Sequence, residues 1–245
     1  EVLLAKGGGE TEKQIYRFTK GDSDLSLRFD LTVPLAKYVA LNYANLAFPF
    51  RRFQIGKVYR GERAQRGRFR EFYQADIDVI GDGKLDISNE AEIPSIIYKA
   101  FTALGLKRFQ IRVNNRKVLN GLFAILGLEK QAGDVMRTID KLEKIGIDNV
   151  KAELRERGID DAAIDRLQPI LELRGDNRRK LSALRDVLSG SETGLKGVEE
   201  LETVFGYVER LGIALAVELD LSLARGLNYY TGAIFEVKAN DYAIG

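Results

Sequence analysis

The sequence of 245 residues contains no cysteine and no histidine. The lack of cysteine excludes a disulfide framework, a thiolate nucleophile and a zinc–thiolate site within these residues. The lack of histidine removes the commonest general base at neutral pH and the commonest metal ligand. Any catalysis by these residues must therefore rest on arginine, lysine and carboxylate side chains, and we predict no metal site built from protein ligands.

The sequence also lacks any run of about 18 apolar residues. No signal-peptide pattern opens it, so we predict no membrane span and expect a cytoplasmic location. The first residue is Glu1 rather than methionine, and we expect the sequence to be part of a longer protein. Its content of 45% hydrophobic and 30% charged residues is ordinary for a soluble globular protein.

Positive charge is concentrated in one short stretch. Residues 51–70 hold eight lysines and arginines and one acid, whereas the whole chain has a formal net charge of only +2. Arginine presents a planar fork of donors that matches phosphate oxygens, and it stays protonated at neutral pH. The stretch is consistent with a phosphate-binding hairpin, with a local nucleic-acid patch, and with a solvated turn that binds nothing.

Strand-like runs rich in Phe, Tyr, Ile and Val alternate with two helices over residues 14–113. Apolar residues at helical spacing predict helices at 34–45 and 89–104. Pro34 is tolerated in a first turn, and Gly105 is a plausible helix stop. The predicted strands are 14–20, 25–32, 51–60, 68–81 and 108–114.

Residues 114–212 repeat apolar side chains every three or four positions and predict a wholly helical module. Strands return in residues 213–245, where "IALAVELDLS" alternates Leu215, Val217 and Leu219 with other residues, and "YYTGAIFEVKA" also alternates. This order predicts an α+β fold with one mostly antiparallel sheet flanked by helices. We expect a core from residues 1–113 and 213–245, interrupted by an inserted helical domain at 114–212.

Read as a strand, residues 68–79 place successive side chains on opposite faces. The odd face is mostly apolar and is predicted to be core: Phe69, Glu71, Tyr73, Ala75, Ile77 and Val79. The even face runs from cations to carboxylates: Arg68, Arg70, Phe72, Gln74, Asp76 and Asp78. A uniform nucleic-acid groove would not end in two acids, because carboxylates repel phosphates. The gradient indicates a bipartite ligand that is anionic at one end.

Three segments resemble the histidyl-tRNA synthetases, a family of class II aminoacyl-tRNA synthetases. "FRRFQIGKVYRGERAQRGRFREFYQADIDVIG" at 50–81 resembles motif 2, and "LSLRFDLTVPLAKYVA" at 25–40 resembles the segment before it. "ARGLNYYTGAIFEV" at 224–237 resembles the family's histidine-recognition signature. The segments occur in the family's order, the resemblance covers essentially the whole chain, and it implies a class II synthetase-like sheet.

The resemblance implies a histidine–tRNA ligase that uses ATP and Mg²⁺ to form histidyl-adenylate, transfers histidine to tRNA(His), and is a homodimer at full length. Arg60 and Arg225 are the implied catalytic residues, because both would contact the α-phosphate where charge develops. This is electrostatic positioning that needs no histidine or cysteine. The implied ATP-binding residues are Arg60, Glu62, Arg68, Arg70 and Phe72.

An imidazole needs an acceptor for its N–H and a polar partner for its other nitrogen, which a carboxylate and a phenol can supply. By resemblance, Asp30, Thr32 and Gln74 would bind the α-amino group of histidine. Asp78 and Tyr230 would contact the imidazole, and Tyr229 would form a wall of the pocket.

The sequence departs from the family pattern in several places. Asn228 stands where the family usually has Asp, and Asp78 where it often has Glu. Motif 1, motif 3 and an anticodon-binding domain are not recognisable. The helical insertion would approach the tRNA acceptor stem by resemblance, whereas by sequence alone it is only a helical bundle.

Two other functions fit parts of the pattern. A synthetase-like regulatory subunit of ATP phosphoribosyltransferase, in histidine biosynthesis, would keep the fold and pocket without charging tRNA. An unrelated RNA-binding α+β protein would need only the basic loop. Arg60, Glu62, Gln74 and Arg225 together favour the ligase, because a protein that does not use ATP has no physical reason to keep the arginines.

Overall fold

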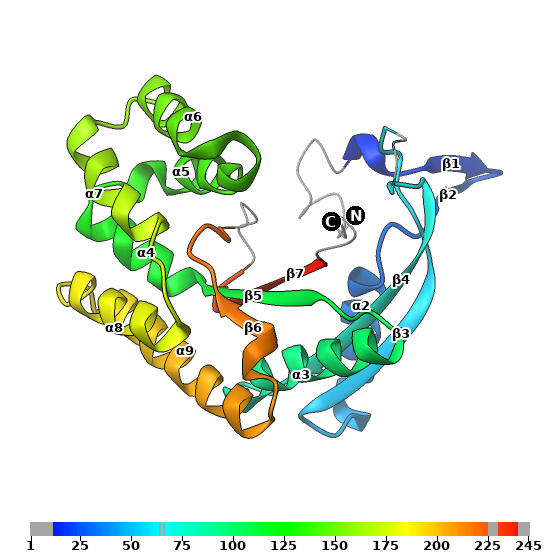
Figure 1. Cartoon of the computed structure of the whole chain (residues 1–245). Coiled ribbons are helices and arrows are strands. Elements are labelled where there is room, and N and C mark those ends of the chain that lie inside the picture. The colour runs from blue at the N-terminus through cyan, green and yellow to red at the C-terminus, as the bar shows by residue number, and fades with distance from the viewer. Residues whose placement is uncertain (1–11, 64, 66, 225–229, 240–245) are drawn as a thin grey trace. The chain divides into compact units, whose positions relative to one another are not determined.

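A computed structural model of the chain describes residues 12–63, 65, 67–224 and 230–239 (Figure 1). The chain divides into two compact units, Glu1–Asp86 and Ile87–Gly245. Within the described ranges, no helix combines the length and the apolar character needed to cross a membrane.

The described part of the first unit contains two hairpins, a short helical segment at residues 12–14 and one longer helix. The longer helix begins at Thr32, so Pro34 lies in the first turn, where a missing N–H breaks no helical hydrogen bond. The predicted strand at 25–32 is therefore shorter than expected and ends at Ser26. The elements are β1 (Arg17–Lys20), β2 (Ser23–Ser26), α2 (Thr32–Asn42), the 3₁₀ turn η1 (Tyr43–Asn45), β3 (Phe50–Tyr59) and β4 (Glu71–Ile80).

The long hairpin of β3 and β4 is the main feature of this unit, and Figure 1 shows the two strands running side by side. The strands are antiparallel, with Arg52 opposite Asp78 and Val58 opposite Phe72. Since side chains alternate between faces, the even-numbered residues of both strands share one face. The predicted gradient therefore lies along one side of a real sheet from Phe72 to Asp78, whereas Arg68 and Arg70 precede β4 and lie in the loop, so the predicted strand is shorter at its start.

The prediction that the odd positions of residues 68–79 face the core was wrong, and the odd positions of β3 share their exposed face. Tyr73 is 68% exposed, and Phe53 and Ile55 on the same face of β3 are 77% and 66% exposed. The apolar character of these side chains suggested burial, but no described element of the first unit covers them. The even face, with its polar side chains, is the half-buried one.

The chain just before α2 covers the even face. A Cβ atom added at Gly56 would lie 3.3 Å from Nη1 of Arg28 and 3.5 Å from Cδ2 of Leu31. The backbone N–H of Tyr59 also donates to the carbonyl of Arg28, over 2.7 Å. Leu31 and Val58 are fully buried there. The small interior of this unit thus forms between residues 28–31 and the polar face of the hairpin.

The second unit contains a three-stranded sheet with β5 in the middle (Figure 1). Its strands are β5 (Phe109–Asn115), β6 (Val217–Leu219) and β7 (Ala233–Ala239). β7 pairs antiparallel with β5, as expected, whereas β6 pairs parallel with it. The strand predicted around Leu215 is shorter than expected, because Leu215 lies in a 3₁₀ turn and is fully exposed.

Helices pack against β5. Its Ile111 and Val113 are fully buried in the main hydrophobic core, together with residues of the helices. The predicted helical region is confirmed as helical from Arg116 to Arg210. Its status as a separate inserted domain stays a prediction. The helices are α3 (Ser88–Ala103), α4 (Arg116–Ile125), α5 (Ala132–Ile139), α6 (Leu142–Glu156), α7 (Asp161–Leu171), α8 (Asn177–Val187) and α9 (Glu192–Arg210), with 3₁₀ turns η2 (Glu129–Gln131) and η3 (Ala214–Ala216).

Helices α4 and α9 cross at a pair of glycines. A Cβ atom added at Gly121 would lie 2.4 Å from Cα of Gly194, so no side chain fits there without movement of the backbone. This close approach brings α4, which follows β5 directly, against the longest helix of the unit.

We expect Gly121→Ala to lower the free energy of unfolding by about 1–3 kcal/mol, the usual cost of overpacking. Gly206→Ala in α9 is the matched control, because nothing lies within 4 Å of its Cβ position. That variant should be neutral or stabilising by up to about 1 kcal/mol, since alanine is the better helix former. Urea unfolding of both variants measures the difference, and equal effects would contradict the close crossing.

Candidate functional site

Arg60 lies at the end of β3 on the covered face of the hairpin. Its Nε donates to the carbonyl oxygen of Phe29 over 3.3 Å, and its Nη2 donates to Oε1 of Gln74 over 3.2 Å. The guanidinium also lies against the rings of Phe29 and Phe72, 4.8 and 5.3 Å from their centroids. These contacts hold a cation in one orientation, as binding of an anionic group requires.

The basic loop adds three further predicted residues to this end of the hairpin: Glu62, Arg68 and Arg70. Nη1 of Arg68 lies 3.5 Å from Oε2 of Glu62, and Nε of Arg70 donates to the carbonyl oxygen of Glu62 over 3.1 Å. The backbone N–H of Arg60 donates to the carbonyl of Arg70 over 3.0 Å. The structure therefore brings together Arg60, Glu62, Arg68, Arg70 and Phe72, the five residues predicted to bind ATP.

Gln74 joins the cationic end of the face to its acidic end. Its amide oxygen accepts from Arg60, while its Nε2 donates to both carboxylate oxygens of Asp76, over 2.8 and 3.0 Å. Both polar ends of the Gln74 amide are thus engaged, which fixes its orientation. Asp76 was seen on this face in the sequence without being assigned to the site, and the structure places it directly beside a predicted ligand-binding residue.

Asp78 lies one step further along the face, opposite Arg52 on β3. Nε of Arg52 is 2.9 Å from Oδ2 of Asp78. Burial raises the pKa of the Asp78 carboxyl and the nearby Asp76 raises it further, whereas the charge of Arg52 lowers it. Sequence reasoning missed Arg52, although the alternation that we applied to β4 would have found it if applied also to β3.

The segment before α2 contributes two predicted residues of different character. Oδ1 of Asp30 accepts from the backbone N–H of Val33 over 3.0 Å, so one of its oxygens supports the start of the helix. Thr32 is the first residue of α2 and is exposed. Asp30 belongs to the same first unit as Arg60 and Asp78.

The remaining predicted residues belong to the second unit. Tyr230 is half-buried and lies three residues before β7. Arg225 and Tyr229 lie outside the described residues.

The end of β5 and the start of α4 contact the chain at two points, just before residues 224–237 and within them. The side-chain amide of Asn114 donates to the carbonyl of Leu223 over 3.0 Å. The backbone N–H of Arg116 donates to the carbonyl of Gly232 over 2.8 Å. Asn114 is fully buried, and burial lowers the pKa of the Arg116 guanidinium. These anchors were not predicted, because buried polar residues at the end of a strand give no pattern in a single sequence.

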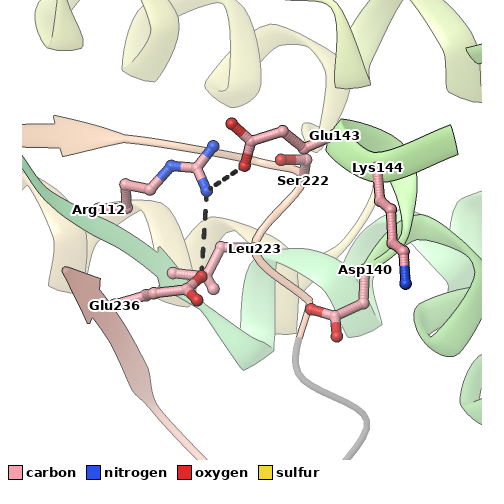
Figure 2. Close-up of a pocket in the computed structure, with 7 residues that line it drawn as sticks. All are labelled: Arg112, Asp140, Glu143, Lys144, Ser222, Leu223 and Glu236. Atoms are coloured by element: carbon pink, nitrogen blue, oxygen red, sulfur yellow. Dashed lines mark hydrogen bonds and ion pairs between the residues drawn. The ribbon is translucent and has the colours of Figure 1, made fainter. Parts of the chain in front are cut away.

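A cavity of about 240 Å³ lies next to this anchored chain (Figure 2). In Figure 2, Arg112 extends toward Glu143 and Glu236, at 3.0 and 4.0 Å, and Nε of Arg112 also lies 2.7 Å from Asp220. Because three carboxylates already neutralise this arginine, the cavity offers little attraction for an anion. Its lining residues are Arg112, Asp140, Glu143, Lys144, Ser222, Leu223 and Glu236, none of which was predicted as a site residue.

Known proteins resemble the chain over nearly all of its length. The family model for histidyl-tRNA synthetase matches residues 1–243. A histidine–tRNA ligase of Clostridium tetani is 54% identical over 243 residues, which are 99% of this chain and 55% of that protein. The chain therefore spans about half the length of the curated relatives it matches.

Solved structures agree with this assignment. The histidyl-tRNA synthetase of a Nostoc species matches with a TM-score of 0.85 and 40% identity, over 93% of this chain and 53% of that one. A Bacillus halodurans protein, described as an ATP phosphoribosyltransferase regulatory subunit/histidyl-tRNA synthetase, matches with a TM-score of 0.80 and 26% identity, over 95% and 59%. The α+β class II fold predicted from the sequence is confirmed.

We expect Asn114→Ala to lower the free energy of unfolding by about 1–3 kcal/mol, because the buried carbonyl of Leu223 loses its donor. Asn149→Ala is the control, since the amide of Asn149 bonds only within its own exposed helix turn. That change should stay within about 0.5 kcal/mol. Thermal or urea unfolding makes the comparison, and a neutral Asn114→Ala would argue against the anchoring role.

Proposed function

The chain belongs to the histidyl-tRNA synthetase family, and we propose that the full-length protein is a histidine–tRNA ligase. In this reaction histidine and ATP form histidyl-adenylate and pyrophosphate, and histidine then passes to tRNA(His). The names of the similar curated proteins support the proposal. The observation that carries it is the single continuous face on which Arg60, Gln74, Asp76 and Asp78 lie in that order.

The cationic end of this face suits ATP. Arg60 would bind the α-phosphate, where negative charge concentrates as the histidine carboxylate attacks. Because Phe29 and Gln74 already orient the guanidinium, little reorganisation is needed when the charge develops. Glu62, Arg68 and Arg70 would contact the phosphates and the adenine side, with Phe72 stacking on the adenine ring.

The acidic end suits histidine. Asp78 would accept an imidazole N–H, and Tyr230 would face the other ring nitrogen, with Tyr229 as a wall of the pocket. Gln74, Asp30 and Thr32 would bind the α-amino group, and the contact of Asp30 Oδ1 with the start of α2 would help to position its carboxylate. Arg225 would lie against the reacting carboxylate and the α-phosphate.

Mg²⁺ would enter with the nucleotide. Among the described residues, no group of three or more acidic side chains could hold a metal by itself. Mg²⁺ in nucleotide sites is often held by substrate phosphates and one or two carboxylates, so this arrangement fits the residues present. The bound ion would neutralise phosphate charge, while the arginines orient the reacting groups.

The proposal extends to the partners of the full-length protein. We expect a homodimer that acts in the cytoplasm, where histidine, ATP and tRNA meet. The second candidate is a regulatory subunit of ATP phosphoribosyltransferase, because one similar solved structure carries that description together with the synthetase name.

One assay separates the two candidates. We expect the full-length protein to exchange radiolabelled pyrophosphate into ATP only when histidine is present, and to charge total tRNA with histidine. A regulatory subunit would bind histidine without supporting either reaction. Omission of histidine, and replacement by another amino acid, are the controls.

Arg225→Ala should slow histidine-dependent pyrophosphate exchange by roughly 100-fold, the usual effect of removing one charge-stabilising group, with little change in melting temperature. Arg178→Ala is the control, because the Arg178 side chain is 89% exposed and makes only a long contact to Glu209. An unchanged exchange rate in Arg225→Ala would remove Arg225 from the chemistry.

A further inference from the structure

Arg52 has the surroundings of a built site residue rather than of a surface cation. It lies in β3 on the covered face, directly opposite Asp78, and its side chain is only 13% exposed. Its neighbour Arg51 lies on the opposite, exposed face. A buried guanidinium is stable only when several acceptors surround it.

Three groups hold the guanidinium of Arg52 in place. Nη2 donates to the carbonyl oxygen of Leu31 over 3.2 Å, Nη1 donates to the side-chain oxygen of Gln54, and Nε faces Oδ2 of Asp78 at 2.9 Å. The last two atoms are shielded from solvent and are close enough for an ion pair, although they are not aligned as a hydrogen bond. The guanidinium of Arg52 is thus held by the backbone carbonyl of Leu31 and by the side chains of Gln54 and Asp78 in the hairpin.

The charge of Arg52 affects how readily the carboxylate of Asp78 ionises. Its side chain is 21% exposed, and Asp76 lies two residues away on the same face. Both burial and a like charge disfavour the ionised carboxylate. Arg52 is the opposite charge in direct contact with it and opposes the rise that burial causes in the pKa of Asp78, so it favours the charged acceptor.

We propose that Arg52 is the positioning residue for histidine recognition: it fixes the rotamer and the charge of Asp78, so that one carboxylate oxygen is presented to the imidazole N–H. This proposal rests on the proposed function, because it takes Asp78 as the imidazole acceptor. One Asp78 oxygen faces Arg52, which leaves the other for the ligand. Arg52 itself acts through Asp78 and does not contact the substrate.

A merely structural role for Arg52 predicts a different outcome. If the arginine only joined β3 to Leu31, its loss would destabilise the hairpin and weaken ATP and histidine binding alike, since both ends of the face share the same strands. A positioning role predicts a selective loss for histidine that requires Asp78 to be present. A double-mutant cycle distinguishes the two.

The test uses the full-length protein and the variants Arg52→Met, Asp78→Asn and the double variant. Histidine Kd is measured by calorimetry without ATP, and the KM values for histidine and ATP by pyrophosphate exchange. Arg52→Met should weaken histidine binding roughly 10- to 100-fold, as for loss of a charged contact, and leave KM for ATP within about twofold. In the Asp78→Asn background, Arg52→Met should add no more than about threefold.

Two further variants complete the design. Arg52→Lys keeps the charge without the fork and should recover part of the histidine affinity, which also guards against misfolding of Arg52→Met. Arg51→Met, on the exposed face, should leave both ligands unaffected. Melting temperatures of all variants are recorded alongside.

Equal losses for ATP and histidine, or a full additional loss in the Asp78→Asn background, would overturn the role of Arg52. Failure of the proposed function would look different. A wild-type protein that binds histidine but gives no exchange would contradict the ligase, and the calorimetric cycle would still decide on Arg52.

Discussion

The antiparallel register of β3 and β4 is the constraint on which the candidate site depends. Arg52 faces Asp78 and Gln54 faces Asp76 because the two strands pair at these positions and no others. A slip of one residue would transfer every side chain of the slipped strand to the opposite face. Arg60 would then lose Gln74, and Asp78 would lose Arg52. The strand pairing therefore determines which side chains of the candidate site lie next to one another.

The polar face is stable only as a connected set. It carries two arginines and two aspartates that are half-buried, and a buried charge is costly unless it is paired. The contacts run from Arg60 through Gln74 to Asp76, and from Gln54 through Arg52 to Asp78. Each charge has a partner of opposite sign or an amide beside it. Such a network is preorganised, so a ligand would meet oriented groups rather than mobile ones.

Much of this arrangement could be predicted from the sequence, because alternation along β4 grouped the correct residues on one face. The choice of the buried face failed for a physical reason. The apolar rings of Phe69 and Tyr73 suggested a core, but burial follows the element that packs there, and residues 28–31 pack on the polar side. The glycine crossing of Gly121 with Gly194 was equally hidden, since contacts between distant helices leave no periodic signal.

The main polar contacts at the end of β5 in the second unit fix the chain at two points, Leu223 and Gly232. The side chain of Asn114, in β5, binds the carbonyl of Leu223, and the backbone N–H of Arg116, at the start of α4, binds the carbonyl of Gly232. Buried amides in such positions cost free energy if a partner is lost. These two contacts therefore fix the chain at Leu223 and at Gly232.

The absence of histidine has a consequence for how this chain could recognise an imidazole. Among its side chains, no group has an ordinary pKa near neutrality. In the proposed complex, the substrate's own ring, whose ordinary pKa is about 6.5, would titrate near neutral pH. A carboxylate oriented by Arg52 can accept an N–H from either form of the ring. Recognition would then follow the shape and donors of the ring, so the orientation of Asp78 matters more than a catalytic base.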